Sequence, residues 1–356
     1  VKMLKVNRRE SKYELLRILS MFMIVVHHFS VYGHFNDLKD NVDIGTVLLC
    51  LRPGGKIGVC IFVMISTYFL IGKSFKASRI INVILITFFY QFVIVLILSF
   101  WGKIKFNFGM LVPNYWFIIA YVELLAFMPV LNAVFRRYKR YLTSEILLVI
   151  FYAFVVLLHL TKILDSNNFV ISFLNPMEFI DFTLLYMITF YIKDKKVPDI
   201  IYWASFLGGV ILYSGAVFNY YSGFFSGIYN PVVIGGTNAS PSVILCTIGI
   251  FGLVKNIKAD YSWNFVNSCA GNVLGVYLIH ENEYLRKYVW DIFNNGSIEN
   301  GIKMLLFALF SGVVIFFVCC MLEYLRKMIL GNAFKKLEII VEDVIGRIFG
   351  RSTYEE

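Results

Sequence analysis

Long apolar runs separated by short polar segments make up most of this chain. Ten of these runs approach the length of about 20 residues that a helix needs to cross a membrane. The predicted spans are residues 14–33, 55–72, 79–100, 111–134, 144–163, 177–192, 200–218, 241–254, 265–282 and 302–325. The eighth run is short, and its helix could begin near Pro231. The pattern predicts an all-α integral membrane protein with about ten transmembrane helices.

Beyond the last run the pattern changes from continuously apolar to amphipathic. Hydrophobic positions recur at helical spacing, at Phe334, Leu337, Val341, Val344, Ile345 and Ile348, with charged residues on the other face. This pattern is typical of a helix that lies on a membrane surface. An interaction helix for a partner is the alternative. We therefore expect a transmembrane domain over residues 1–325 and a cytoplasmic amphipathic tail over 326–356.

Composition and charge agree with this division. Hydrophobic residues make up 59% of the 356 residues and charged residues only 16%, which excludes an ordinary soluble domain. With the N-terminus inside, the inner segments of the ten-span arrangement carry 23 of the 33 lysines and arginines. Positive charge accumulates on the cytoplasmic side of membrane proteins. The sequence therefore predicts a multi-pass plasma-membrane protein with both ends in the cytoplasm.

The first apolar run contains two basic side chains, Arg17 and His28. Eleven positions advance a helix by three turns plus about 20°, so both side chains share one face, about 16 Å apart. Ionisable groups inside a membrane are costly unless they line a cavity, and they usually mark a working site. Glu14 is three positions from Arg17 and can pair with it. The pattern predicts a channel-like or funnel-like central cavity, whereas His27 points elsewhere and packs on a neighbouring helix.

Two further groups of residues have open interpretations. Lys76 and Arg79 begin the third span on its inner side, where they are either topological anchors or ligands for phosphate groups. The string from Arg52 to Gly58 is rich in glycine, which permits tight backbone bends. It lacks the P-loop pattern, so we do not interpret it as a phosphate loop.

Polar residues also gather at the outer ends of the predicted spans. His280 and Glu281 end the ninth span, and Glu178 and Asp181 begin the sixth. Each could orient an imidazole or a sugar hydroxyl, or simply form a polar rim. Residues 200–254 carry no charge, and their middle is rich in Tyr, Gly, Asn and Ser. We favour an interfacial aromatic belt with an outer loop, with a sugar-binding platform as the alternative.

The six cysteines are scattered and mostly lie within apolar runs, so we interpret them as packing residues without disulfides. None of them has the spacing of a metal site, and we expect no metal.

Several motifs occur in a fixed order along the chain. They are Arg17-x10-His28 preceded by Glu14, the run from Gly55 to Leu70, Lys76-Ala-Ser-Arg79, the Trp116–Tyr121 element and Val276-Tyr277-Leu-Ile-His280. This order resembles the membrane-bound acyltransferase-3 family, the bacterial O-acyltransferases of surface polysaccharides. The chain departs from the family pattern at Thr67, which stands in place of Gly, at Phe117 in place of Tyr, and at Lys76 in place of Arg.

The resemblance implies transfer of an acyl group, with acetyl favoured, from acyl-CoA to a sugar hydroxyl. It assigns His28 as general base or transient acyl carrier, with Arg17 and Glu14 beside it. Arg17, Lys76 and Arg79 are expected to hold the phosphates of acetyl-CoA or another acyl-CoA. Residues expected to contact the acceptor are Trp116, Tyr121, Glu178, Asp181 and His280. The expected partners are a lipid-linked or surface polysaccharide, membrane lipids and polysaccharide-assembly proteins, with no nucleic acid.

Other classes of membrane protein remain compatible with the same pattern. Inner cations and an intramembrane histidine also suit a proton-coupled transporter or flippase for polysaccharide precursors. A glycan polymerase is another multi-span basic protein. The chain shows no internal repeat, which counts against many transporter folds.

Overall fold

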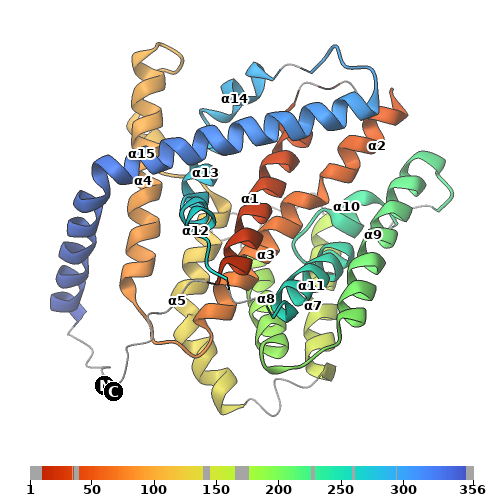
Figure 1. Cartoon of the computed structure of the whole chain (residues 1–356), viewed down its shortest axis with the longest axis horizontal. Helices are drawn as coiled ribbons and strands as arrows, with labels where there is room; N and C mark the ends of the chain where they lie inside the picture. Colours follow the sequence, from red (N-terminus) through yellow and green to blue (C-terminus); the bar gives the residue numbers. More distant parts are fainter. Residues whose placement is uncertain are drawn as a thin grey trace.

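The computed structural model describes residues 10–33, 35, 40–138, 145–164, 176–225, 229–258, 261–293 and 295–349. Within these ranges the regular elements are helices, without a strand, which confirms the predicted all-α class (Figure 1). The elements are α1 (Ser11–Tyr32), α2 (Val42–Leu51), α3 (Pro53–Leu70), α4 (Ala77–Phe100), η1 (Phe108–Leu111), α5 (Trp116–Arg137), α7 (Glu145–Leu164), α8 (Pro176–Asp194), α9 (Asp199–Ser222), α10 (Pro231–Gly235), α11 (Pro241–Asn256), α12 (Asn264–Ala270), α13 (Val273–His280), α14 (Arg286–Ile292) and α15 (Gly301–Phe349).

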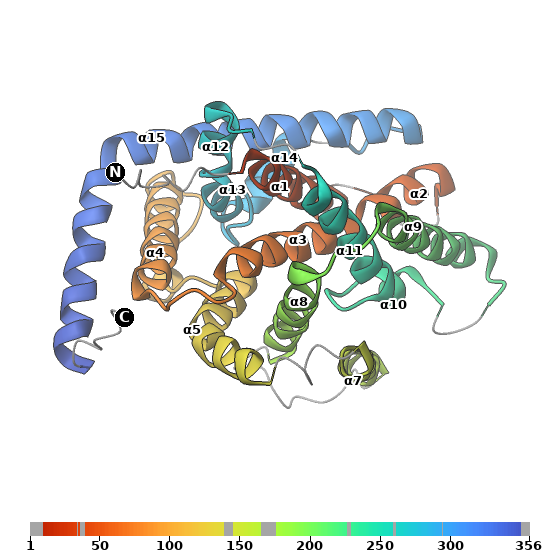
Figure 2. The same ribbon diagram turned by 60° about the horizontal axis from the view of Figure 1, so that its bottom comes forward.

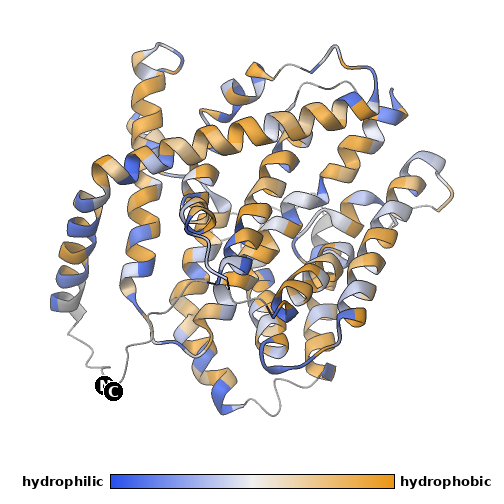
Figure 3. Cartoon of the chain, in the orientation of Figure 1, coloured by the Kyte–Doolittle hydropathy of each residue, from blue (hydrophilic) through white to orange (hydrophobic). Residues whose placement is uncertain are grey.

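Six stretches in the described part of the chain are long and apolar enough to cross a membrane. They are Ser11–Tyr32, Val42–Leu70, Ala77–Phe100, Trp116–Arg137, Asp199–Ser222 and Gly301–Val344. Their middles are hydrophobic, and polar residues gather towards helix ends and connections (Figure 3). The other predicted spans also coincide with helices, but these are shorter or interrupted. The chain is thus a multi-helix membrane protein, and the count of ten spans and the cytoplasmic termini stay predictions.

Helix α1 lies at the centre of the molecule, where it packs against α3, α15, α12, α13 and α2 (Figure 2). Helix α15 runs across the other long helices and changes direction before its end (Figure 1). Neighbours on several sides take the stripe of Glu14 and His28 out of contact with lipid, leaving these residues 7% and 9% exposed. The ionisable groups of the first helix therefore lie within protein, as their cost in a membrane requires.

Small residues allow α3 to approach α1 closely. A Cβ added at Gly58 would lie 2.5 Å from the carbonyl oxygen of Ser20, and one added at Gly55 would overlap the ring of His27. Glycine at helix interfaces in membranes permits this close backbone contact. These glycines lie inside a helix, so the prediction that they permit a tight bend is wrong, because their function here is packing.

The predicted ninth span is two helices instead of one. Helix α12 ends at Ala270 and α13 begins at Val273, with Gly271 and Asn272 between them. Non-helical backbone at membrane depth is tolerated only when protein satisfies its polar groups. Lys327 does so, because its ammonium group donates to the carbonyl oxygen of Gly271 at 2.5 Å and to Asn272 Oδ1 at 2.9 Å. Hydropathy alone gave no sign of this break, although the pair Gly271-Asn272 is a sequence signal for the end of a helix.

The boundary predicted after residue 325 is not an interruption of structure. Helix α15 continues through it from Gly301 to Phe349. Arg326 is buried against Glu323, with Nε to Oε2 at 2.7 Å and Nη2 to Oε1 at 2.7 Å. The start of the predicted tail therefore belongs to the packed helix. All six cysteines are free thiols, as expected.

Candidate functional site

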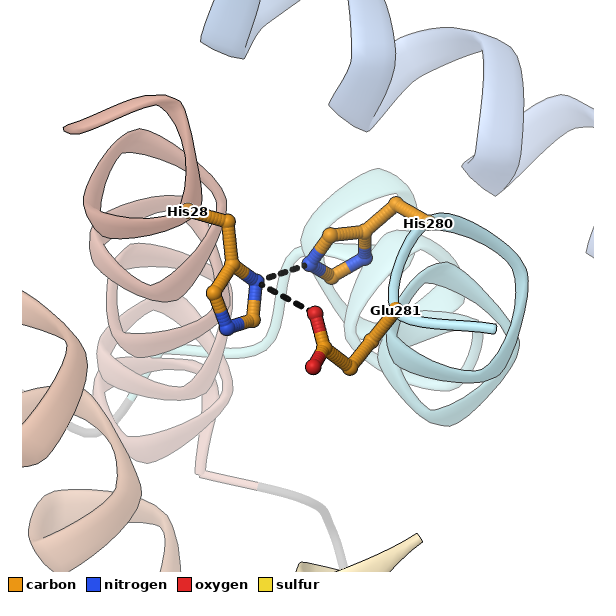
Figure 4. Close-up of side chains that lie close together, drawn as sticks. All are labelled: His28, His280 and Glu281. Carbon is orange, nitrogen blue, oxygen red and sulfur yellow. Dashed lines mark hydrogen bonds and ion pairs between the residues drawn. The ribbon is translucent and has the colours of Figure 1, made fainter. Parts of the chain in front are cut away.

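Three side chains from two helices meet at the site (Figure 4). His28 projects from α1, one turn before its end, while His280 is the last residue of α13 and Glu281 follows it. His28 Nδ1 lies 2.9 Å from His280 Nε2 and 3.3 Å from Glu281 Oε2. All three residues are less than one-tenth exposed. The structure thus joins the histidine of the first span to the polar pair predicted at the end of the ninth.

The hydrogen bonds define which ring nitrogens carry protons. His280 Nδ1 lies 2.5 Å from the carbonyl oxygen of Val276. A carbonyl oxygen only accepts hydrogen bonds, so Nδ1 of a neutral His280 carries the proton and Nε2 is an acceptor. His28 Nδ1 then donates to His280 Nε2. This leaves the lone pair of His28 on Nε2, free to take a proton or attack an electrophile.

Glu281 is fixed by a separate set of contacts. Its Oε1 accepts a hydrogen bond from the hydroxyl of Tyr32 at 3.0 Å and lies 3.3 Å from Arg286 Nη1. Arg286 also donates to the Tyr32 hydroxyl at 3.1 Å. The carboxylate is therefore anchored through one oxygen. Its other oxygen is buried beside His28 and can stabilise a positive charge on that ring.

A pocket of about 120 Å³ lies beside these groups. His28, Tyr32, Glu281, Trp116 and Tyr277 are among its lining residues. A larger cavity of about 660 Å³ shares His27 and Lys56 with it. The histidine pair is therefore next to a space that could admit a small molecule.

His28, His280 and Glu281 also have the donor set of a metal site. One ligand atom from each residue lies within 4.8 Å of the others. Two imidazoles and a carboxylate suit zinc, and the bond from His280 Nδ1 to a carbonyl is a common outer-shell contact of zinc-bound histidine. These are the residues that could hold a metal, and the expectation of a metal-free enzyme stays a prediction.

A family model for an acyltransferase domain matches residues 11–324. The chain belongs to the acyltransferase 3 family. The comparisons with curated proteins and with solved structures found no match. The resemblance seen in the motifs is thereby confirmed, and His28, His280 and Glu281 lie together in an acyltransferase.

In this acyltransferase Glu14 and Arg17 form the ion pair that their spacing indicated. Arg17 Nη1 lies 2.8 Å from Glu14 Oε2, and the guanidinium lies 5.7 Å from the centre of the Phe62 ring. Neither of the two cavities at His27 and His28 includes Arg17 in its lining. The predicted lumen shared by Arg17 and His28 therefore stays a prediction.

Lys76 and Arg79 lie together at the expected inner side of the acyltransferase. With Lys73 they border a small hollow of about 10 Å³ against α5. Arg79 Nη1 donates to the carbonyl oxygen of Ser74 at 3.2 Å. Three cations within seven residues give this surface a positive charge. Their assignment to the donor phosphates is untested.

The predicted acceptor residues divide into two groups. Trp116 lines the pocket of His28, and His280 holds that histidine. Asp181 instead pairs with His159, with Oδ1 2.8 Å from Nε2, and Tyr121 stacks on Phe117 at 5.6 Å. Glu178 Oε2 is buried without a hydrogen bond from the described residues. The last three residues do not appear in the lining of the pocket of His28.

Sequence reasoning missed several residues of the acyltransferase site. Tyr32 and Arg286 anchor Glu281, Tyr277 lines the pocket, and Lys56 lies between the two cavities. A signal for Lys56 was present, since a lysine at the start of a predicted apolar span, residues 55–72, can mark a functional site. No pattern connected Tyr32 with Arg286, because they lie far apart in sequence and meet only through α1 and α14.

Proposed function

We propose that this protein is a membrane O-acyltransferase that moves an acyl group, with acetyl favoured, from acyl-CoA to a hydroxyl of a surface polysaccharide or exopolysaccharide sugar. The observation that carries the proposal is the orientation of His28. His280 and Glu281 hold its Nδ1, while Nε2 keeps a free lone pair on a residue that lines a pocket. In a member of an acyltransferase family, this is the arrangement of a base that activates a hydroxyl.

The proposed reaction begins with an acceptor hydroxyl at His28 Nε2. The ring takes the hydroxyl proton as the oxygen attacks the thioester carbonyl, which gives a tetrahedral adduct. The C–S bond then breaks, and the imidazolium returns its proton to the departing CoA thiolate. Glu281 Oε2, 3.3 Å from Nδ1, stabilises the positive charge that His28 carries in between.

The same lone pair also permits a two-step route. Nε2 would attack the thioester directly, CoA would leave, and the acceptor would then take the acyl group from the ring. Both routes need the same orientation of His28. Rapid acid quenching without acceptor separates them, because only the second route leaves label on the protein.

The donor is proposed to bind with its phosphates near Arg17, Lys76 and Arg79. Its extended arm is comparable in length to the Arg17–His28 offset of about 16 Å. Aromatic rings occupy part of this region, since Phe62 lies beside Arg17 and contacts Phe117 at 5.7 Å. Phe117 in turn contacts Tyr277 of the pocket at 5.4 Å. Donor binding would therefore require these rings to move.

The deciding experiment compares purified wild-type protein with His28→Ala, using labelled acetyl-CoA and cell-envelope glycan. We expect transfer to fall by at least about 100-fold, because a positioned base contributes about 10²–10⁴. His159→Ala is the matched control, since it also removes a histidine from an ion pair, and its partner Asp181 does not line the pocket of His28. Unchanged transfer in His28→Ala would refute the mechanism. Donor-independent glycan flux in the wild type would favour a transporter instead.

A further inference from the structure

The larger cavity beside the site is lined partly by charged side chains and partly by neutral ones. It lies between α1, the α2–α3 junction, α9 and α10, and has a volume of about 660 Å³. Arg52 and Lys56 contribute positive charge on one side. Tyr213, Tyr220, Asn230 and Gly236 contribute a neutral side, and all come from the charge-free stretch of residues 200–254.

Neither of the two cations makes a close ion pair in the described part of the chain, and the carboxylates of Glu178 and Asp181 attract the Lys56 ammonium only from beyond ion-pair distance. Neither side chain makes a hydrogen bond there, and Arg52 Nε is buried without a partner. The Lys56 ammonium also lies 4.8 Å from the centre of the Trp116 ring. A partly buried cation without an anion is costly, and truly buried charges are normally paired.

Three other arginines of the protein that are buried or partly buried each pair with a glutamate. Arg17 pairs with Glu14, Arg326 with Glu323 and Arg286 with Glu281. The position is unusual as well, because by the expected topology Arg52 and Lys56 lie on the outer side, where positive charge is scarce. Two unpaired cations that converge on one cavity indicate that the missing anion belongs to a ligand.

We propose that this cavity binds the acceptor, and that the acceptor is an acidic glycan whose phosphate or carboxylate group lies between Arg52 and Lys56. This rests on the proposed function and adds the chemical class of its second substrate. Lys56 lines both cavities, so an anion bound there lies next to the pocket of His28. Charge would thus fix the glycan while a neighbouring hydroxyl reaches the base.

The neutral wall suits the sugar rings of such a ligand. Tyrosine faces pack on the apolar side of a sugar, and amide and hydroxyl groups bond its oxygens. The Tyr213 hydroxyl is already bonded to the carbonyl oxygen of Leu49 at 2.8 Å, which fixes its ring. The aromatic segment predicted as an interfacial belt with an outer loop therefore fits its alternative, a sugar-binding platform.

The test uses purified protein in detergent and three soluble acceptors: methyl β-glucuronide, glucose 1-phosphate and neutral methyl β-glucoside. Binding is measured by isothermal titration, and acetyl transfer by mass spectrometry. We expect the wild type to bind one or both acidic sugars at least about 10-fold more tightly than the neutral sugar, as charge-assisted hydrogen bonds would give. In Arg52→Gln/Lys56→Met this preference should disappear, with the acidic and neutral sugars then bound about equally.

The control Lys105→Met/Lys287→Met removes two exposed cations from the same expected side, away from the cavity, and should keep the preference. Equal binding of acidic and neutral sugars by the wild type would overturn the proposal. A raised KM for acetyl-CoA with unchanged acidic-sugar binding in the cavity variant would also overturn it, because the anion would then be a donor phosphate. Binding preference without any acetyl transfer by the wild type would refute the proposed function alone.

Discussion

At the scale of single residues, the site depends on one backbone contact. The carbonyl oxygen of Val276 fixes the proton of His280, His280 fixes the proton of His28, and the lone pair of His28 is thereby placed on Nε2. Two neutral imidazoles suit this arrangement, since each ring then has one nitrogen that carries a proton and one that carries a lone pair. His280 is thus a positioning residue that acts through His28.

This assignment predicts different results for two substitutions of His280. His280→Leu removes the acceptor for His28 Nδ1 and should lower kcat by about 10–100-fold, the range seen when orienting partners of histidine are lost. His280→Gln retains an oxygen acceptor and should recover part of the loss. The pH–rate profile should change in His280→Leu while the KM for acetyl-CoA stays constant. Equal loss in both variants, with an unchanged profile, would indicate only a packing function.

A second prediction concerns metal ions. Transfer is expected to persist after dialysis against EDTA, because the proposed route uses His28 as a base. Added zinc should inhibit it, since zinc would occupy Nδ1 of His28 and Nε2 of His280 with a carboxylate oxygen of Glu281. The measurement is the rate of acyl transfer over a series of free zinc concentrations. In Glu281→Gln, inhibition should require a higher zinc concentration. Loss of transfer in EDTA with recovery on zinc would instead identify a metal enzyme.

The sequence was sufficient to predict part of this site. Helical phase predicted that His27 packs on a neighbouring helix, and its Nδ1 lies 2.6 Å from the carbonyl oxygen of Arg52, but His27 also lines the pocket of His28. The i,i+3 spacing correctly paired Glu14 with Arg17. The pair of Asp181 and His159 was not predictable, because spacing within one helix carries no information about which neighbour it meets.

At the scale of elements, the contact between α1 and α3 determines where the site lies. It brings Lys56 to the level of His28 and fixes His27 against Gly55. Hydropathy located both helices, but it could not show that glycines inside α3 form the interface. It also could not show the break between α12 and α13, because the satisfying group, Lys327, comes from another helix.

This interface predicts the effect of adding one methyl group. Gly58→Ala should destabilise the protein by about 1–3 kcal/mol, because the new Cβ would overlap the Ser20 carbonyl oxygen and force the helices apart. Gly208→Ala in α9 is the matched control, since no atom lies within 4 Å of its Cβ. That control should be neutral or stabilising, as expected for Gly replaced by Ala in a helix. Thermal unfolding in detergent measures both, and equal melting temperatures would contradict the interface.

At the scale of the whole molecule, the proposed substrates approach from opposite faces. The cations Lys73, Lys76 and Arg79 lie at the expected inner side, whereas the cavity with Arg52 and Lys56 lies at the expected outer side. On the proposed function, an enzyme built in this way would use acyl-CoA from the cytoplasm and modify a glycan that has left it. The sequence predicted this polarity from charge placement, but the outer cavity arises from four separate segments and could not be predicted.

Sealed vesicles of known orientation test this polarity. In inverted vesicles, which expose the cytoplasmic face, added acetyl-CoA should be consumed, because the donor site is then accessible. Right-side-out vesicles should release CoA only after permeabilisation with detergent, since acetyl-CoA does not cross the bilayer. His28→Ala vesicles provide the background for both orientations. Equal consumption by both sealed preparations would mean that the donor also enters from the outer side, and the cations at Lys76 and Arg79 would then have only a topological function.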